Sequence, residues 1–247
     1  MFLKARAFPN FAAALPRLAA VILIALTVPG VAQQMSSATT TPKDHTMAVT
    51  LPEDVYTDSG FRLPLPKREQ LDAEGQRMYD MILNPKTRTL VGLRGPLGIQ
   101  LYSPRVAELE HELNDYLRYQ AGFSGPVREL AIIVTAREMN SQFEWGIHER
   151  MARKEGLDLR TIDVVKFRKS TVDLPEKEAV IIELGRQMFR EKKVTSETYS
   201  HALKIFGQRG LVDLVSLMGN YSSKASLLTT FNAIDIDNGP NPALPMP

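Results

Sequence analysis

Apolar residues recur every three to four positions between Lys67 and Phe231, and this helical period constrains the fold more than any other feature of the sequence. Residues typical of helix starts and ends flank these stretches. They predict helices over 67–83, 103–122, 127–140 and 142–156, a short helix near residue 162, and three more marked by the apolar positions of 180–188, 199–206 and 211–231. No alternating strand joined to a two-residue turn is found, and charged flanks favour helix even for the β-branched segment AIIVT. We therefore predict an all-α, multi-helix bundle.

The second predicted helix has the clearest apolar stripe. Ser103 is placed to cap it, with Pro104 in the first turn. One side then carries Val106, Leu109, Leu113 and Leu117. We expect this side to face a core.

The first 32 residues have the layout of a secretory signal peptide. Three basic residues come first, an apolar run covers 18–28, and small residues follow at Gly30 and Ala32. The apolar run is about half the roughly 20 residues that cross a bilayer, so a stable membrane anchor is not expected. We predict export to the periplasm or the medium, with cleavage after Ala32.

Composition divides the rest of the chain into three parts. Residues 33–60 are rich in Ser, Thr, Pro and Asp and predict a disordered linker. Residues 61–234 form the predicted helical domain. Residues 235–247 contain four prolines and predict an extended tail.

Charge and cysteine content exclude several functions. Removal of a leader with three basic and no acidic residues changes the formal charge from +2 to −1. Without a basic excess we expect no nucleic-acid partner and no attraction to an anionic membrane surface. The chain has no cysteine, which excludes a thiol nucleophile, a thiolate metal site and a dithiol redox cycle.

The predicted helix 127–140 directs an acid toward apolar neighbours. Glu129 shares a face with Ile132, Ile133 and Ala136. Burial there would raise the pKa of Glu129 and suit it to proton transfer. The alternative is an acid that stabilises the first turn of a helix through the helix dipole.

The next helix places Glu144 and His148 four residues apart on one face. A carboxylate can orient an imidazole for acid or base work, although an exposed ion pair would have the same spacing. A metal site made by Glu144, His148 and His201 is a weaker alternative. Trp145 is interpreted as a pocket wall or as plain core, and His45 and His111 as solvated residues.

Three segments together resemble the carboxymuconolactone decarboxylase and alkylhydroperoxidase-D superfamily: RGPLGIQLYSP (94–104), RELAIIVTARE (128–138) and EWGIHERMARKEGL (144–157). The resemblance covers about residues 60–240 and implies the helical bundle of that superfamily. Its peroxidase branch has two cysteines where this chain has Ser141 and Glu144, so peroxidase chemistry by that mechanism is not expected. The thiol-free decarboxylase branch has glutamate before the histidine, as here.

The resemblance to the decarboxylase branch implies a reaction without cofactor or metal on a small carboxylated or lactone compound. His148 would move the proton, Glu144 would orient it and Glu129 would complete the relay. An arginine would neutralise the substrate carboxylate, with Arg94, Arg128 and Arg137 as candidates.

Two hypotheses about function stay open at this point. The chain is either a lyase of this kind or an exported, non-catalytic protein that binds small molecules or assembles on the same fold. In both cases, the breadth of the apolar faces and the resemblance imply a homo-oligomer, a trimer or a multiple of three.

Overall fold

The computed structural model describes residues 51–237 and 243–246, and within these ranges all regular secondary structure is helical, without strands. The predicted all-α class is confirmed. The helices are α1 (Ala73–Leu83), α2 (Pro96–Gln100), α3 (Pro104–Asp115), α4 (Gly125–Glu138), α5 (Gln142–Lys154), α6 (Leu159–Lys166), α7 (Glu176–Gly185) and α8 (Ser196–Thr230). Short helical segments η1 (Arg68–Gln70), η2 (Gly92–Arg94), η3 (Tyr116–Gln120) and η4 (Arg186–Glu191) lie between them.

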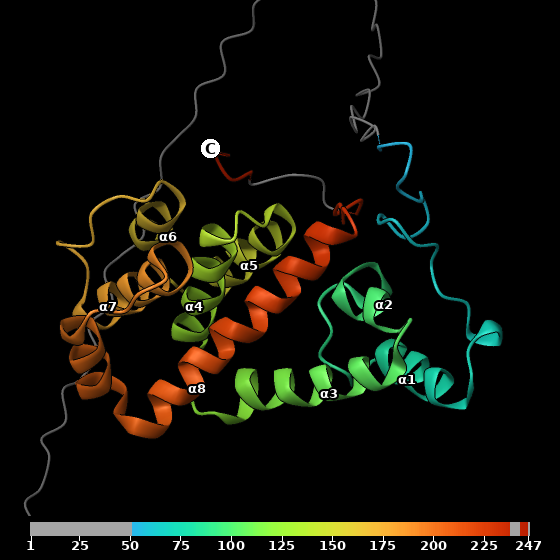
Figure 1. Cartoon of the computed structure of the whole chain (residues 1–247), viewed down its shortest axis with the longest axis horizontal. Coiled ribbons are helices and arrows are strands. Elements are labelled where there is room, and N and C mark those ends of the chain that lie inside the picture. Colours follow the sequence, from blue (N-terminus) through green and yellow to red (C-terminus); the bar gives the residue numbers. More distant parts are fainter. Residues whose placement is uncertain (1–50, 238–242, 247) are drawn as a thin grey trace, which may run out of the picture. The chain divides into compact units, whose positions relative to one another are not determined.

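Helix α4 is the centre of the main core. It packs against α5, α7 and α8, which surround it in Figure 1. Its side chains from Arg128 to Arg137 are all buried, including the fully enclosed Leu130, Ile132 and Ile133. An ionisable residue on α4 therefore lies inside the protein whichever face it occupies.

Helix α8 is formed by two helical stretches that meet at Gly207. This residue has φ 68° and ψ 176°, outside the helical region. The sequence predicted two helices separated here, and the backbone changes direction at that residue. The second stretch continues alongside α4 and ends at Thr230, close to the predicted end.

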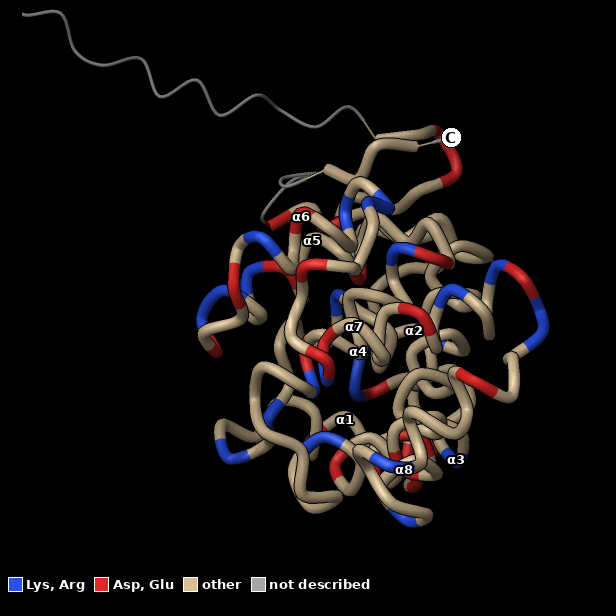
Figure 2. The backbone as a smooth tube through the Cα atoms, turned by 90° about the vertical axis from the view of Figure 1, so that its left-hand side faces the viewer, with Lys and Arg blue, Asp and Glu red and all other residues tan. Residues whose placement is uncertain are grey.

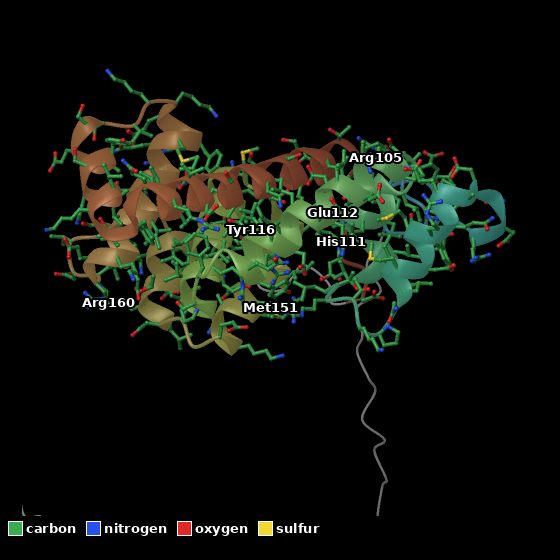
Figure 3. All side chains as sticks on the ribbon, turned by 90° about the horizontal axis from the view of Figure 1, so that it is seen from below. Arg105, His111, Glu112, Tyr116, Met151 and Arg160 are labelled. Atoms are coloured by element: carbon green, nitrogen blue, oxygen red, sulfur yellow. The ribbon has the colours of Figure 1, made fainter. Side chains whose placement is uncertain are left out.

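Two predictions about the helix 103–122, which contains α3, were wrong. Val106, Leu109 and Leu113 are exposed, whereas only Leu117 of the predicted stripe is buried, because α3 contacts α1, α2 and α8 through its other side. The last turn is also not α-helical. In η3 the Ala121 N–H donates to the Tyr116 carbonyl five residues earlier, which makes this turn a π-helix that continues α3 (Figure 3).

The predicted disordered linker extends too far. Residues 51–60 form turns packed on the domain, with Val55 and Ser59 buried and the Ser59 hydroxyl bonded to the carbonyls of Phe61 and Leu63. The apolar side chains of Val55 and Phe61 outweigh the polar composition that suggested disorder. The first regular α-helix likewise begins at Ala73, capped by Asp72, instead of at residue 67.

Residues 231–237 after α8 contain two turns, and the described tail residue Leu244 is anchored. The side-chain amide of Gln142 donates to the Leu244 carbonyl and accepts from its N–H, and Leu244 is buried. The predicted signal peptide and residues 33–50 of the predicted linker lie outside the described residues.

Charges of both signs are interspersed along the described backbone (Figure 2). In this part of the chain, no helix has the length and apolar character to cross a membrane.

Candidate functional site

A buried ion pair between α4 and α5 forms the centre of the site. His148 Nδ1 lies 2.7 Å from Glu129 Oε2, and both side chains are enclosed. Glu129 is on the side of α4 that packs against α5, as its contact with His148 shows. The structure thus brings together two residues that the sequence could place only on separate helices.

Two arginines complete the surroundings of Glu129. Its Oε1 accepts from Arg128 Nε at 2.9 Å and from an Arg118 guanidinium nitrogen at 3.1 Å. Burial works to raise the pKa of this carboxyl, but the cations of His148, Arg118 and Arg128 outweigh burial and lower it to about 2. The expected raised pKa was wrong, because the sequence did not show that three cations converge on this carboxylate. Glu129 is a fixed anion.

His148 lies between two carboxylates. Its Nε2 is 3.4 Å from Glu144 Oε2, on the side opposite Glu129. Burial works to lower the pKa of His148, but the charges of Glu129 and Glu144 outweigh it and raise the pKa above 6.5. The two carboxylates therefore favour the doubly protonated imidazole, which is the form that can act as an acid.

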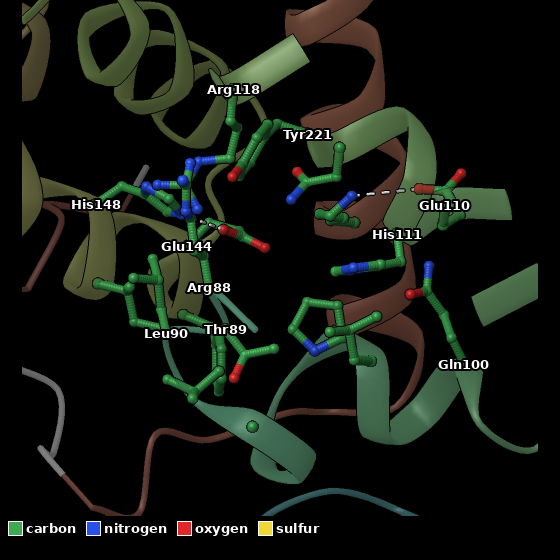
Figure 4. Close-up of a pocket in the computed structure, with 18 residues that line it drawn as sticks. Arg88, Thr89, Leu90, Gln100, Glu110, His111, Arg118, Glu144, His148 and Tyr221 are labelled. Carbon is green, nitrogen blue, oxygen red and sulfur yellow. Dashed lines mark hydrogen bonds and ion pairs between the residues drawn. The ribbon is translucent and has the colours of Figure 1, made fainter. Parts of the chain in front are cut away.

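A small cavity adjoins this triad, with Glu144 and His148 in its wall (Figure 4). The volume open to the centres of water molecules is about 80 Å³. Leu97, Phe143 and Ile147 provide apolar surface. Glu129 does not line the cavity; it lies behind His148 and positions the imidazole.

Helix α8 supplies two further polar groups to the cavity wall, Tyr221 and Lys224. The Tyr221 ring meets the His148 ring edge-on, with centroids 5.0 Å apart and an interplanar angle of 86°. Lys224 Nζ contacts Glu110 Oε2 at 3.2 Å and Asn220 Oδ1 at 2.8 Å. The cavity is therefore bounded by an acid and an imidazole from α5 and by a phenol and an ammonium group from α8.

Four buried side-chain atoms lack a hydrogen-bond partner within the described residues. Two of them, Glu138 Oε2 and Arg168 Nε, are 3.3 Å apart in an ion pair. The other two, Gln100 Oε1 and Arg118 Nε, belong to residues that line the cavity. Buried polar groups are normally paired, so these two atoms are exceptions close to the cavity.

The three predicted substrate arginines do not line the cavity. Arg94 is on the surface and bonds to Asp237 at 2.6 Å. Arg137 is near the other end of α4 and bonds to the Lys166 carbonyl and to Asn140. Arg128 lies behind the site, where Glu129 and Glu155 pair with it.

The structure also shows where the remaining candidate residues lie. Trp145 is core, and its Nε1–H donates to Glu149 at 3.1 Å. His201 pairs with Glu176 on the surface, so the considered metal set of Glu144, His148 and His201 is not assembled. His111 was interpreted as solvated but is half-buried in the cavity wall. Among the described residues, no group of three or more His, Cys, Asp or Glu side chains is arranged to hold a metal ion.

Sequence reasoning missed Arg88, Arg118, Tyr221 and Lys224, all of which line the cavity. Arg88 and Arg118 lie over the Tyr119 ring, at 4.5 and 5.1 Å from its centroid. The spacing of three between Tyr221 and Lys224 was a usable signal that both share one helix face. Nothing local in the sequence indicates that this face meets α5.

No protein-family model, curated protein or solved structure matches this chain.

Proposed function

We propose that this protein is a cofactor-independent lyase that decarboxylates a small carboxylated lactone, in the manner of carboxymuconolactone decarboxylase-like enzymes. The observation that carries the proposal is the buried contact of 2.7 Å between Glu129 and His148, with His148 in the wall of a cavity. A protonated imidazole held by a fixed carboxylate is a suitable proton donor to a carbanion at neutral pH.

In the proposed reaction, the bond between the lactone ring and its carboxylate carbon breaks and carbon dioxide leaves. The electron pair of that bond passes into the ring as an enolate. His148 donates a proton to the ring carbon and is reprotonated from water. Glu144 orients the transferred proton, and Glu129 holds the imidazole and balances its charge.

The test is release of carbon dioxide from a carboxymuconolactone by the wild type and by His148→Ala. Loss of the acid should lower turnover by at least about 100-fold. His201→Ala is the matched control, because His201 pairs with a glutamate at the same distance on the surface. Equal turnover by wild type and His148→Ala would refute the assigned role.

The same lactone also distinguishes the lyase from the non-catalytic binding protein. If calorimetry detects binding of the lactone and chromatography finds no loss of it over time, the protein is a binding protein and not a lyase. A loss that depends on His148 excludes that alternative.

We also propose that the protein forms the homo-oligomer expected from its sequence. The exposed apolar side chains of Val106, Leu109 and Leu113 on α3 support this, because contiguous exposed apolar surface is typical of an interface. Light scattering should give a mass above the monomer, and Leu109→Glu with Leu113→Glu should reduce it. A monomeric wild type at micromolar concentration contradicts the proposal.

A further inference from the structure

The α8 side of the cavity has no role in the proposed proton transfer. Tyr221 and Lys224 are three residues apart in a regular part of α8, so their side chains lie on one helix face. Both line the cavity that Glu144 and His148 also line. Figure 4 shows Tyr221 beside Arg118 and above Glu144, with its phenol directed inward.

Tyr221 presents a donor without a protein partner. The residue is 3% exposed, and no hydrogen bond joins its hydroxyl to any described residue. Burial raises the pKa of this phenol above its ordinary value, so it stays protonated. Its edge-on contact with His148 places the phenol next to the group that supplies the proton.

Lys224 presents a second donor. Its ammonium group has three N–H bonds, and Glu110 and Asn220 account for two of them. These two contacts fix the buried Nζ at the cavity wall, 5.4 Å from the centroid of the Tyr221 ring, and leave one N–H without a hydrogen-bond partner among the described residues. Burial lowers the pKa of Lys224, while Glu110 and Glu144 favour its charged form.

Two buried donors on one wall suit a negative oxygen that forms during a reaction. We propose that Tyr221 and Lys224 form an oxyanion site for the enolate oxygen of the lactone, an inference that rests on the proposed function. When carbon dioxide leaves, the electron pair of the broken bond moves into the ring and onto its carbonyl oxygen. The Tyr221 hydroxyl and the free Lys224 N–H stabilise that oxygen until His148 protonates the ring carbon. The enolate oxygen then becomes a neutral carbonyl oxygen again, and water reprotonates His148.

The first test is binding, which does not require turnover. Tetronate, the anion of an enol lactone, serves as the mimic of the enolate, and 2(5H)-furanone is the neutral lactone of similar size. Calorimetry should show that the wild type prefers tetronate. Tyr221→Phe and Lys224→Met should each reduce this preference at least about tenfold while leaving furanone affinity nearly unchanged.

Tyr199→Phe is the matched control, because Tyr199 is an exposed tyrosine at the start of the same helix. It should keep the wild-type preference for tetronate. If Lys224→Met fails to fold, the result for Tyr221→Phe alone tests the oxyanion site. This variant removes one oxygen and keeps the ring contact with His148. An unchanged preference in Tyr221→Phe overturns the inference.

The second test is kinetic and separates this inference from the proposed function. Once a compound that the protein decarboxylates is known, its turnover can be measured. Tyr221→Phe should lower kcat about 10²-fold with little change in KM, as expected for a group that acts only in the transition state. If the wild type shows no turnover but its tetronate preference depends on Tyr221 and Lys224, the lyase proposal fails and the anion site stands. If turnover is normal and kcat is insensitive to Tyr221, the oxyanion site is refuted and the lyase proposal stands.

Discussion

Among the residues that the structure describes, two histidine–glutamate pairs have the same separation of 2.7 Å, His148–Glu129 and His201–Glu176. In the first pair the side chains are 4% and 0% exposed, and in the second 38% and 63%. Two more cations contact Glu129, whereas Glu176 bonds to His201 alone among the described residues. Equal distances therefore occur in unequal surroundings. The comparison shows that enclosure and neighbouring charges, more than the contact itself, give a pair its chemical properties.

The largest difference should appear when each glutamate loses its charge. Glu129→Gln removes the carboxylate that His148, Arg118 and Arg128 share, and it leaves the buried Arg118 without an ion-pair partner among the described residues. It should lower the free energy of unfolding by about 3 to 5 kcal/mol. Glu176→Gln should leave it unchanged within error, since water replaces the lost contact. Urea denaturation measures both values. Equal losses in the two variants would contradict the distinction.

The second-largest effect should come from acid, which removes the stabilisation of the fold by the buried Glu129 carboxylate. The pKa of Glu129 falls from its ordinary 4.5 to about 2 in the folded state. Its stabilisation is therefore fully present above pH 4.5 and is lost as the pH falls toward 2, an effect on the order of 3 kcal/mol. The unfolding free energies of wild type and Glu129→Gln should converge over this range. A constant gap down to pH 2 would show that the pKa is not lowered.

A rise in pH should remove the charge of His148, the other partner of the buried pair. Because the folded pKa of His148 is raised above 6.5, its charge stabilises the fold fully below pH 6.5, and this stabilisation is lost as the pH rises through the folded pKa. Nitrogen-15 NMR should find His148 doubly protonated at pH 7. The stability gap between wild type and His148→Gln should narrow as the pH rises. A neutral His148 at pH 7 would contradict the role of proton donor.

Salt should produce the smallest effect, on the exposed pair. His201 lowers the pKa of Glu176 through a hydrogen bond and its charge. At 1 M salt the screening length is about 3 Å, so the pKa of Glu176 should move back toward 4.5. The pKa of Glu129 should not move, because its partners exclude solvent. Carbon-13 NMR of the carboxyl groups distinguishes the two, and equal sensitivity would show that Glu129 is hydrated.

The sequence predicted the helices well because their apolar period and their Pro and Gly boundaries are local signals. It erred where tertiary contacts decide. The stripe of Val106, Leu109 and Leu113 indicated a buried face, but a periodic pattern does not show which surface covers it. Residues 51–60 seemed disordered because single apolar residues such as Val55 carry little weight in a polar stretch.

The site was predicted in part. Spacing joined Glu144 to His148 on α5, but the contact between Glu129 and His148 depends on how α4 packs against α5. The direction of the Glu129 pKa was wrong for the same reason, since Arg118 comes from a separate π-helical turn. Tyr221 lies 73 positions after His148, and no local pattern links residues so far apart. Interhelical geometry is the information that the sequence pattern lacks.

The bend at Gly207 bears on how relatives of this chain can be recognised. Its φ of 68° with ψ of 176° belongs to a region that essentially only glycine occupies. An added Cβ would meet no atom within 4 Å, so the restriction comes from the backbone alone and repacking of neighbours would not relieve it. Any homologue that keeps this bend must keep its glycine, however far its other residues diverge.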